Sequence, residues 1–131
     1  MSEHILVIDD ERDIRQLISL ILETEGYTVT QCGGGSEGLQ LLEQEPFDLV
    51  VLDIMMPEMD GWSVCRQIRL NPSTRDIPVL ILTVRNQPLD RVIGLEVVRA
   101  DGYLIKPFER EELITTVAQL VALRHSSVKP A

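Results

Sequence analysis

Four short apolar runs, none of which alternates with polar residues, constrain the fold of this chain more than any other feature. They lie at residues 5–8, 49–52, 79–82 and 103–105 and consist mostly of Val, Ile and Leu. Strands that are buried on both faces have this pattern, whereas strands with one solvated face alternate. Residues 27–32 do alternate, so we expect this fifth run to lie at a sheet edge. The sequence therefore predicts a largely buried parallel sheet.

Apolar residues with helical spacing separate these runs. Two segments show the spacing clearly, one after the first run and one near the C-terminus: Ile14, Leu17, Ile18 and Ile21, then Leu113, Val117, Leu120 and Val121. This spacing is typical of amphipathic helices. Residues 36–44, 62–70 and 88–98 are weaker helix candidates, with prolines around them. A strand followed by a helix, five times in a row, predicts an α/β fold with a doubly wound, five-stranded parallel sheet.

The length of the chain indicates how many domains it forms, and its cysteines indicate its redox environment. A chain of 131 residues is typical of one domain. We expect this domain to occupy residues 1–124, and residues 125–131 to be a polar tail or the start of a linker. Cys32 and Cys65 have no metal-site spacing, so we expect two reduced thiols in a cytoplasmic protein.

The charge balance disfavours two classes of partner. Twelve Lys and Arg residues against 21 Asp and Glu residues give a net charge of 12 − 21 = −9. Nucleic-acid binding needs a basic footprint, and anionic membrane surfaces attract basic segments. No apolar run approaches the roughly 18–20 residues of a membrane span. We therefore expect neither nucleic acid nor a membrane to be a direct partner of this domain.

Polar side chains follow the buried runs at the point where each run ends. Asp9 and Asp10 follow the first run, Asp53 follows the run at 49–52, and Thr83 and Lys106 follow the last two. In a parallel sheet these positions share the carboxyl edge, where open α/β sheets bind their ligands. Each residue alone has an ordinary structural interpretation, such as a helix cap or a surface lysine. Their coincidence at strand ends favours a site.

This set of side chains suits phosphoryl transfer. Three crowded carboxylates repel one another unless a cation joins them, and Mg²⁺ prefers oxygen ligands of this kind. A lysine and a hydroxyl can hold further oxygens of a phosphoryl group. A carboxylate can attack phosphorus, and Asp53 is the candidate because the adjacent pair Asp9 and Asp10 suits metal ligation. The residues thus predict metal-assisted phosphoryl transfer onto Asp53.

Four segments resemble the receiver domain of bacterial two-component response regulators. They are Val-Ile-Asp-Asp-Glu at 7–11, the stretch from 51 to 61 with Asp53 and Met-Pro, Ile-Leu-Thr at 81–83, and Tyr-Leu-Ile-Lys-Pro-Phe at 103–108. The likeness covers about residues 4–124. It implies a flavodoxin-like fold with strand order 2-1-3-4-5, and a signalling switch rather than a dedicated enzyme.

The resemblance also implies a role for each matching residue. Asp53 would accept a phosphoryl group from a histidine kinase or phosphotransfer protein. Asp9, Asp10 and Asp53, with the main-chain carbonyl of Met55, would bind Mg²⁺.

Thr83 and Lys106 would then contact the phosphoryl oxygens, and Tyr103 would turn inward as a switch when Thr83 moves. The peptide bond between Lys106 and Pro107 would be cis, a form that only proline makes accessible. The face formed by the fourth helix, fifth strand and fifth helix would change conformation and could serve a homodimer. Self-dephosphorylation would be slow.

Two features depart from the family pattern. Val84 follows Thr83 where a small residue is usual, and we expect its branched side chain to narrow access to the phosphoryl group. The segment 94–103 is one residue longer than the common pattern, with Arg99 where glycine is usual.

Three other interpretations compete with this one. Residues 33–38 fit the dinucleotide pattern G-x-G-x-x-G, but they follow the predicted edge strand, so a flexible loop before the second helix is the simpler interpretation. Aspartate-based phosphatases need a second Asp two positions after the nucleophile, and Met55 stands there. A degenerate receiver that only binds partners is disfavoured by the intact set of site residues.

Overall fold

The computed structural model describes residues 2–126, with side chains through Arg124. In this part of the chain five parallel strands form one sheet in the order β2-β1-β3-β4-β5. The strands are β1 (His4–Ile8), β2 (Thr28–Cys32), β3 (Leu49–Leu52), β4 (Val79–Thr83) and β5 (Gly102–Ile105). The predicted fold class and strand order are confirmed. The alternating strand β2 lies at one edge, as expected; apolar β5 forms the other edge.

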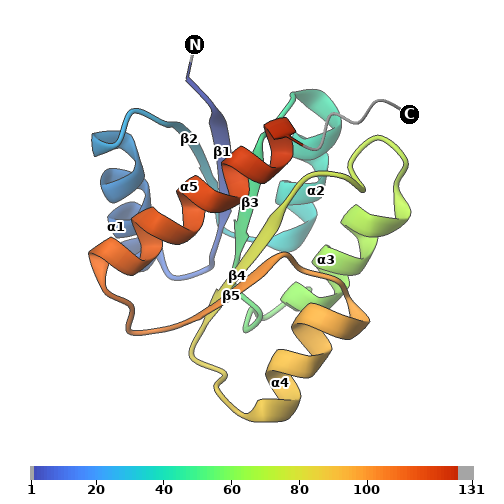
Figure 1. The fold of residues 1–131 in the computed structure, drawn as a ribbon. Helices are drawn as coiled ribbons and strands as arrows, with labels where there is room; N and C mark the ends of the chain where they lie inside the picture. The colour runs from blue at the N-terminus through green and yellow to red at the C-terminus, as the bar shows by residue number, and fades with distance from the viewer. Residues whose placement is uncertain (1, 127–131) are drawn as a thin grey trace.

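Helices cover both faces of the sheet (Figure 1). They are α1 (Arg12–Thr24), α2 (Gly35–Gln44), α3 (Gly61–Leu70), α4 (Pro88–Val92), the π-helix η1 (Ile93–Val97) and α5 (Arg110–Ser126). Helices α1 and α5 pack on one face, where buried Leu22 and Leu113 belong to one core cluster. Helices α2 and α3 pack on the other face with a second cluster. The predicted tail at 125–131 begins inside α5, and residues 127–131 lie outside the described part of the chain.

The two cysteines are buried in the second cluster and are free thiols. Burial raises the pKa of Cys32 and of Cys65 to about 11, because the thiolate loses its hydration. Both thiols therefore remain protonated at neutral pH.

The helix predicted at 36–44 is confirmed, and it begins one residue earlier than expected, at Gly35, because the glycines before and within it allow close packing. Helix α2 begins at Gly35, and both Gly35 and Gly38 are buried. A Cβ at Gly35 would come within 2.5 Å of Val64, and one at Gly38 would overlap Ile8. Only glycine allows α2 to approach β1 and α3 this closely.

The helix predicted over 88–98 contains a change of helix type. Helix α4 ends at Val92, and η1 continues as a π-turn in which the Val98 nitrogen donates to the Ile93 oxygen at 2.9 Å. A π-turn holds one residue more than an α-turn, so it absorbs the extra residue of this segment. Arg99 then takes a left-handed conformation with φ 62°, at the position where the family pattern has glycine.

Candidate functional site

Three aspartates meet at the carboxyl edge of the sheet. Strands β1 and β3 are paired so that Ile8 lies beside Leu52, which sets Asp9 and Asp53 side by side. Asp9 and Asp53 are buried and Asp10 is exposed. One carboxylate oxygen from each of the three lies within 4.8 Å of the others. Neither Asp9 nor Asp10 is the N-cap of α1, because Glu11 occupies that position.

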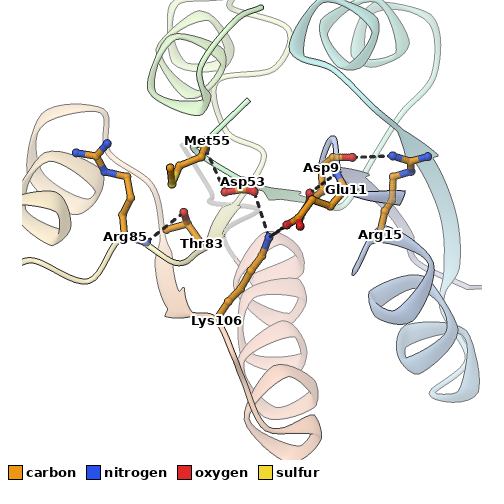
Figure 2. A network of polar contacts seen from close by, with 8 residues as sticks. All are labelled: Asp9, Glu11, Arg15, Asp53, Met55, Thr83, Arg85 and Lys106. Atoms are coloured by element: carbon orange, nitrogen blue, oxygen red, sulfur yellow. Dashed lines mark hydrogen bonds and ion pairs between the residues drawn. The ribbon is translucent and has the colours of Figure 1, made fainter. Parts of the chain in front are cut away.

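Lys106 reaches this cluster from the end of β5. Its Nζ lies 2.8 Å from Asp9 Oδ2 and 3.1 Å from Asp53 Oδ2 (Figure 2). Glu11 Oε1 is 3.6 Å from the same nitrogen, although the Glu11 side chain is largely exposed. The expected cis peptide between Lys106 and Pro107 is present. A residue separated from Asp53 by 53 positions in the chain is thus in contact with it.

Burial and charge oppose each other in this cluster. Burial raises the pKa of Asp9, with a contribution from the nearby Asp53 charge, although contacts with Lys106 and the Glu11 amide act in the opposite direction. Burial alone would lower the pKa of Lys106, but the hydrogen bonds and charges of Asp9 and Asp53 outweigh it and raise this pKa. The ammonium of Lys106 therefore neutralises only part of the negative charge on the carboxylates around it.

Two further contacts define the surroundings of Asp53. The Met55 amide donates to Asp53 Oδ1 at 3.1 Å, which fixes the orientation of the carboxylate. Thr83 is fully buried at the end of β4, the strand next to β3, and Figure 2 shows it on the side of Asp53 away from Asp9. Its Oγ1 accepts a 3.4 Å hydrogen bond from the Arg85 amide. All of the predicted strand-end side chains thus gather at one edge.

An open cleft lies beside Asp53, between the loop after β3 and the loop after β4. Its lining combines apolar and charged side chains: Ile54, Met55, Met56, Asp60, Trp62 and Arg85. Met55 and Val84 are about half exposed, at 50% and 55%. The buried carboxylate of Asp53 is therefore next to space that a small donor group can enter.

Tyr103 is already buried in this structure. Its side chain packs so closely on Gly94 that a Cβ there would lie 2.9 Å from the ring. Its hydroxyl donates to the Arg85 main-chain oxygen at 2.8 Å, and the Arg91 guanidinium lies 5.5 Å from the ring centroid.

Two arginines near the site were not predicted from the sequence. Arg85 forms a 2.8 Å ion pair with the buried Asp90, and Arg15 donates from Nη1 to the Asp9 main-chain oxygen at 2.7 Å. The capping box formed by Gln87 and Asp90 at the start of α4 is a sequence pattern that could have drawn attention to Asp90. No local sequence pattern indicates that the Arg15 guanidinium contacts the Asp9 main chain.

The donor set fits Mg²⁺. Hard divalent cations take carboxylate and carbonyl oxygens, and Asp9, Asp10 and Asp53 present three such oxygens close enough to share one ion. Two of the three carboxylates are buried, and among the side chains that the structure describes only Lys106 forms an ion pair with them, so a further cation would be stabilised here.

Comparisons with known proteins show the family to which this chain belongs. The sequence model of the response regulator receiver domain family matches residues 5–118. The chain is 43% identical to response regulator MprA of Mycobacterium ulcerans over 121 residues, which are 92% of this chain and 51% of that protein. It is 41% identical to the DNA-binding dual master transcriptional regulator RpaA of Synechocystis over 132 residues, which are 95% of this chain and 54% of that protein.

Solved structures show the same fold. Chemotaxis protein CheY4 of Vibrio cholerae superposes with a TM-score of 0.87 at 32% identity, over 92% of this chain and 99% of that one. A response regulator structure from Chloroflexus aurantiacus gives a TM-score of 0.89 at 31% identity, over 93% of this chain and 99% of that one.

The chain belongs to the response regulator receiver domain family. It spans about half the length of the curated relatives named above. Within residues 2–126, no helix is both long and apolar enough to cross a membrane.

Proposed function

We propose that this domain is a phosphoryl-accepting switch in which Asp53 receives the phosphoryl group of a histidine kinase or phosphotransfer protein. The observation that carries the proposal is the position of Asp53: buried, 3.1 Å from Lys106 Nζ, and within 4.8 Å of Asp9 and Asp10. A carboxylate so placed combines a nucleophile with the cationic and metal-binding groups that phosphoryl transfer needs.

The transfer itself exchanges one bond to phosphorus for another. A carboxylate oxygen of Asp53 forms the new P–O bond while the P–N bond to the donor imidazole breaks, and that imidazole takes up a proton. The Met55 amide and Lys106 Nζ hold the two oxygens of Asp53 before the reaction. Lys106 is then close enough to pair with the added charge.

Magnesium would be held by Asp9, Asp10 and Asp53, with the main-chain carbonyl of Met55 as a further ligand. When bound, it supplies charge neutralisation for an acyl phosphate that forms between carboxylates. The chain's own residues provide the rest: Asp9 is fixed by Lys106 and the Glu11 amide, and Asp10 faces solvent, where a hydrated ion arrives.

Phosphorylation would shift the population of two packings of the α4–β5–α5 face. Thr83 would turn from the Arg85 amide toward a phosphoryl oxygen, and the loop that carries Arg85 also binds the Tyr103 hydroxyl. A change at Thr83 would thus reach Tyr103 through one short loop. Val84, beside the site, would affect the slow self-dephosphorylation that ends the signal.

The same proposal assigns the domain's limits and partners. Residues 1–124 form the receiver, the partner is a histidine kinase or phosphotransfer protein, and a homodimer forms through the α4–β5–α5 face. Direct nucleic-acid contact is not expected because the chain as a whole carries a net charge of −9. The free, buried thiols Cys32 and Cys65 suit the reducing cytoplasm.

Mass spectrometry after incubation with acetyl phosphate and Mg²⁺ tests the function. We expect a mass gain of one phosphate that Asp53→Asn abolishes. Asp60→Asn is the matched control, because Asp60 lies in the same loop and an asparagine can keep its cap to Ser63. A wild-type chain that gains no phosphate, or a gain that persists in Asp53→Asn, contradicts the proposal.

A further inference from the structure

We propose that Arg15 is a positioning residue for the Mg²⁺ ligands, because its guanidinium holds the peptide unit that joins Asp9 to Asp10. Arg15 lies on the first turns of α1, and its Nη1 donates to the Asp9 main-chain oxygen at 2.7 Å (Figure 2). That oxygen and the Asp10 nitrogen belong to the same rigid peptide plane. The inference rests on the proposed function, since it concerns how the metal ligands are held.

Asp10 is the ligand that needs this support. Both carboxylate oxygens of Asp9 are already fixed, one by the Glu11 amide at 2.9 Å and the other by Lys106 at 2.8 Å. The Asp10 carboxylate is exposed and accepts no hydrogen bond from residues 2–126. Its direction therefore depends on the orientation of its own backbone, which the Arg15 hydrogen bond sets.

Within residues 2–126, one donor of the Arg15 guanidinium contributes no hydrogen bond to the fold. Its Nε is buried and has no hydrogen-bond partner among the described residues. An unsatisfied buried donor is unfavourable for folding. The guanidinium also lies near the turn after β2, where a Cβ at Gly33 would be in ordinary van der Waals contact with Nη1 at 3.4 Å. The side chain thus joins two loops while one of its own donors is unpaired.

Arg15 also adds positive charge without competing for the metal ligands. Lys106 contacts carboxylate oxygens of Asp9 and Asp53, whereas Arg15 donates to a main-chain carbonyl and contacts none of the carboxylate oxygens that would bind the metal. A cation in this position reduces the repulsion among the acidic groups and still permits a metal ion to bind them. Partners behind metal ligands commonly change metal affinity by about 10–100-fold.

A Mg²⁺ titration followed by the fluorescence of Trp62 tests this role. Trp62 is the sole tryptophan and lines the cleft next to Met55. We expect Arg15→Met to raise the Kd for Mg²⁺ about tenfold. The matched control Arg12→Met removes the same charge from the exposed start of α1 and should change Kd by less than about twofold. Melting without Mg²⁺ is measured alongside, because Arg15→Met also removes the donor to the Asp9 main-chain oxygen and can lower stability by itself.

Arg15→Lys adds a conservative variant. It keeps the charge but is shorter and lacks the guanidinium fork, so we expect its Kd to lie between those of the wild type and Arg15→Met. A wild-type Kd in Arg15→Met, or an equal loss in Arg12→Met, overturns the inference. If Arg15→Met does not fold, a wild-type Kd in Arg15→Lys overturns it, and a raised Kd supports it. A wild-type chain that binds no Mg²⁺ would instead contradict the proposed function.

Discussion

The Tyr103 hydroxyl donates a 2.8 Å hydrogen bond to the main-chain oxygen of Arg85, two residues beyond Thr83. This bond ties the edge strand β5 to the loop after β4. Gly94 of η1 and Arg91 of α4 confine the same ring. Tyr103 is therefore buried in this structure and linked to the loop that follows Thr83.

Replacing Tyr103 with phenylalanine should remove this connection and keep the packing of the ring. We expect the free energy of unfolding to fall by about 1 kcal/mol, the usual net value of such a hydrogen bond. Urea unfolding measures it. Tyr27→Phe is the control, because the Tyr27 hydroxyl donates no hydrogen bond within residues 2–126, and it should change stability by less. Equal values for the two variants would show that the Arg85 contact contributes nothing.

Glycine at position 99 should stabilise the protein. Arg99 has φ 62°, a left-handed conformation that costs a side-chain-bearing residue about 1 kcal/mol or more. Because glycine is more flexible when unfolded, we expect a net gain of about 0.5–1 kcal/mol in thermal or urea unfolding. Arg75→Gly, at an exposed turn without positive φ, should instead lose stability. A loss in Arg99→Gly as large as that in Arg75→Gly would contradict this account.

Lys106→Met should leave Asp9 and Asp53 buried without their cation. Breaking such a buried pair costs about 3 kcal/mol near neutral pH, compared with at most about 1 kcal/mol for Arg110→Met, whose ion pairs at 3.8 Å are on the surface. Urea unfolding without Mg²⁺ measures both. A variant as stable as the wild type would show that the ammonium does not offset the carboxylates.

The pH dependence of Lys106→Met follows from Asp9. Burial already raises the pKa of Asp9 above its ordinary 3.8, and the variant loses the opposing contacts with Lys106. A carboxyl whose folded pKa exceeds its unfolded pKa binds more protons when folded. The free energy of unfolding should therefore rise as the pH falls from neutral through the folded pKa toward the ordinary value. Stability that falls steadily over this interval would contradict the expected sign.

Magnesium should raise the melting temperature, because the folded chain alone brings Asp9, Asp10 and Asp53 together. At a free concentration one hundred times Kd the gain is about 2.7 kcal/mol. Asp10→Asn should remove most of this gain, yet change stability without Mg²⁺ by no more than about 0.5 kcal/mol, since Asp10 is exposed. Sodium chloride at equal ionic strength is the control for screening, and an equal shift with that salt would contradict specific binding.

The sequence predicted the sheet and the gathering of the site residues because both depend on short-range patterns. Unbroken apolar runs identify buried parallel strands, and a polar residue directly after each run must lie at the carboxyl edge. Asp9, Asp53 and Lys106 were found in this way, and the contacts among them are confirmed.

The features that were missed depend on tertiary contacts or on side-chain reach. Gly35 and Gly38 are required by the close approach of Val64 and Ile8, which no pattern near residue 35 reveals. The Arg15 side chain contacts the backbone six residues earlier. The contacts of a long, flexible side chain produce no periodic pattern in the sequence, so this one could not be predicted.

The π-turn at Ile93–Val97 has a consequence for comparing this chain with its relatives. One turn of helix takes up the extra length, so β4 and β5 keep their register with each other, from Leu80 beside Gly102 to Thr83 beside Ile105. An alignment gap belongs inside this turn, upstream of Ala100 and Asp101. Placed after Lys106, it would offset Tyr103 and Lys106 by one position and hide two residues that stand where the family has them.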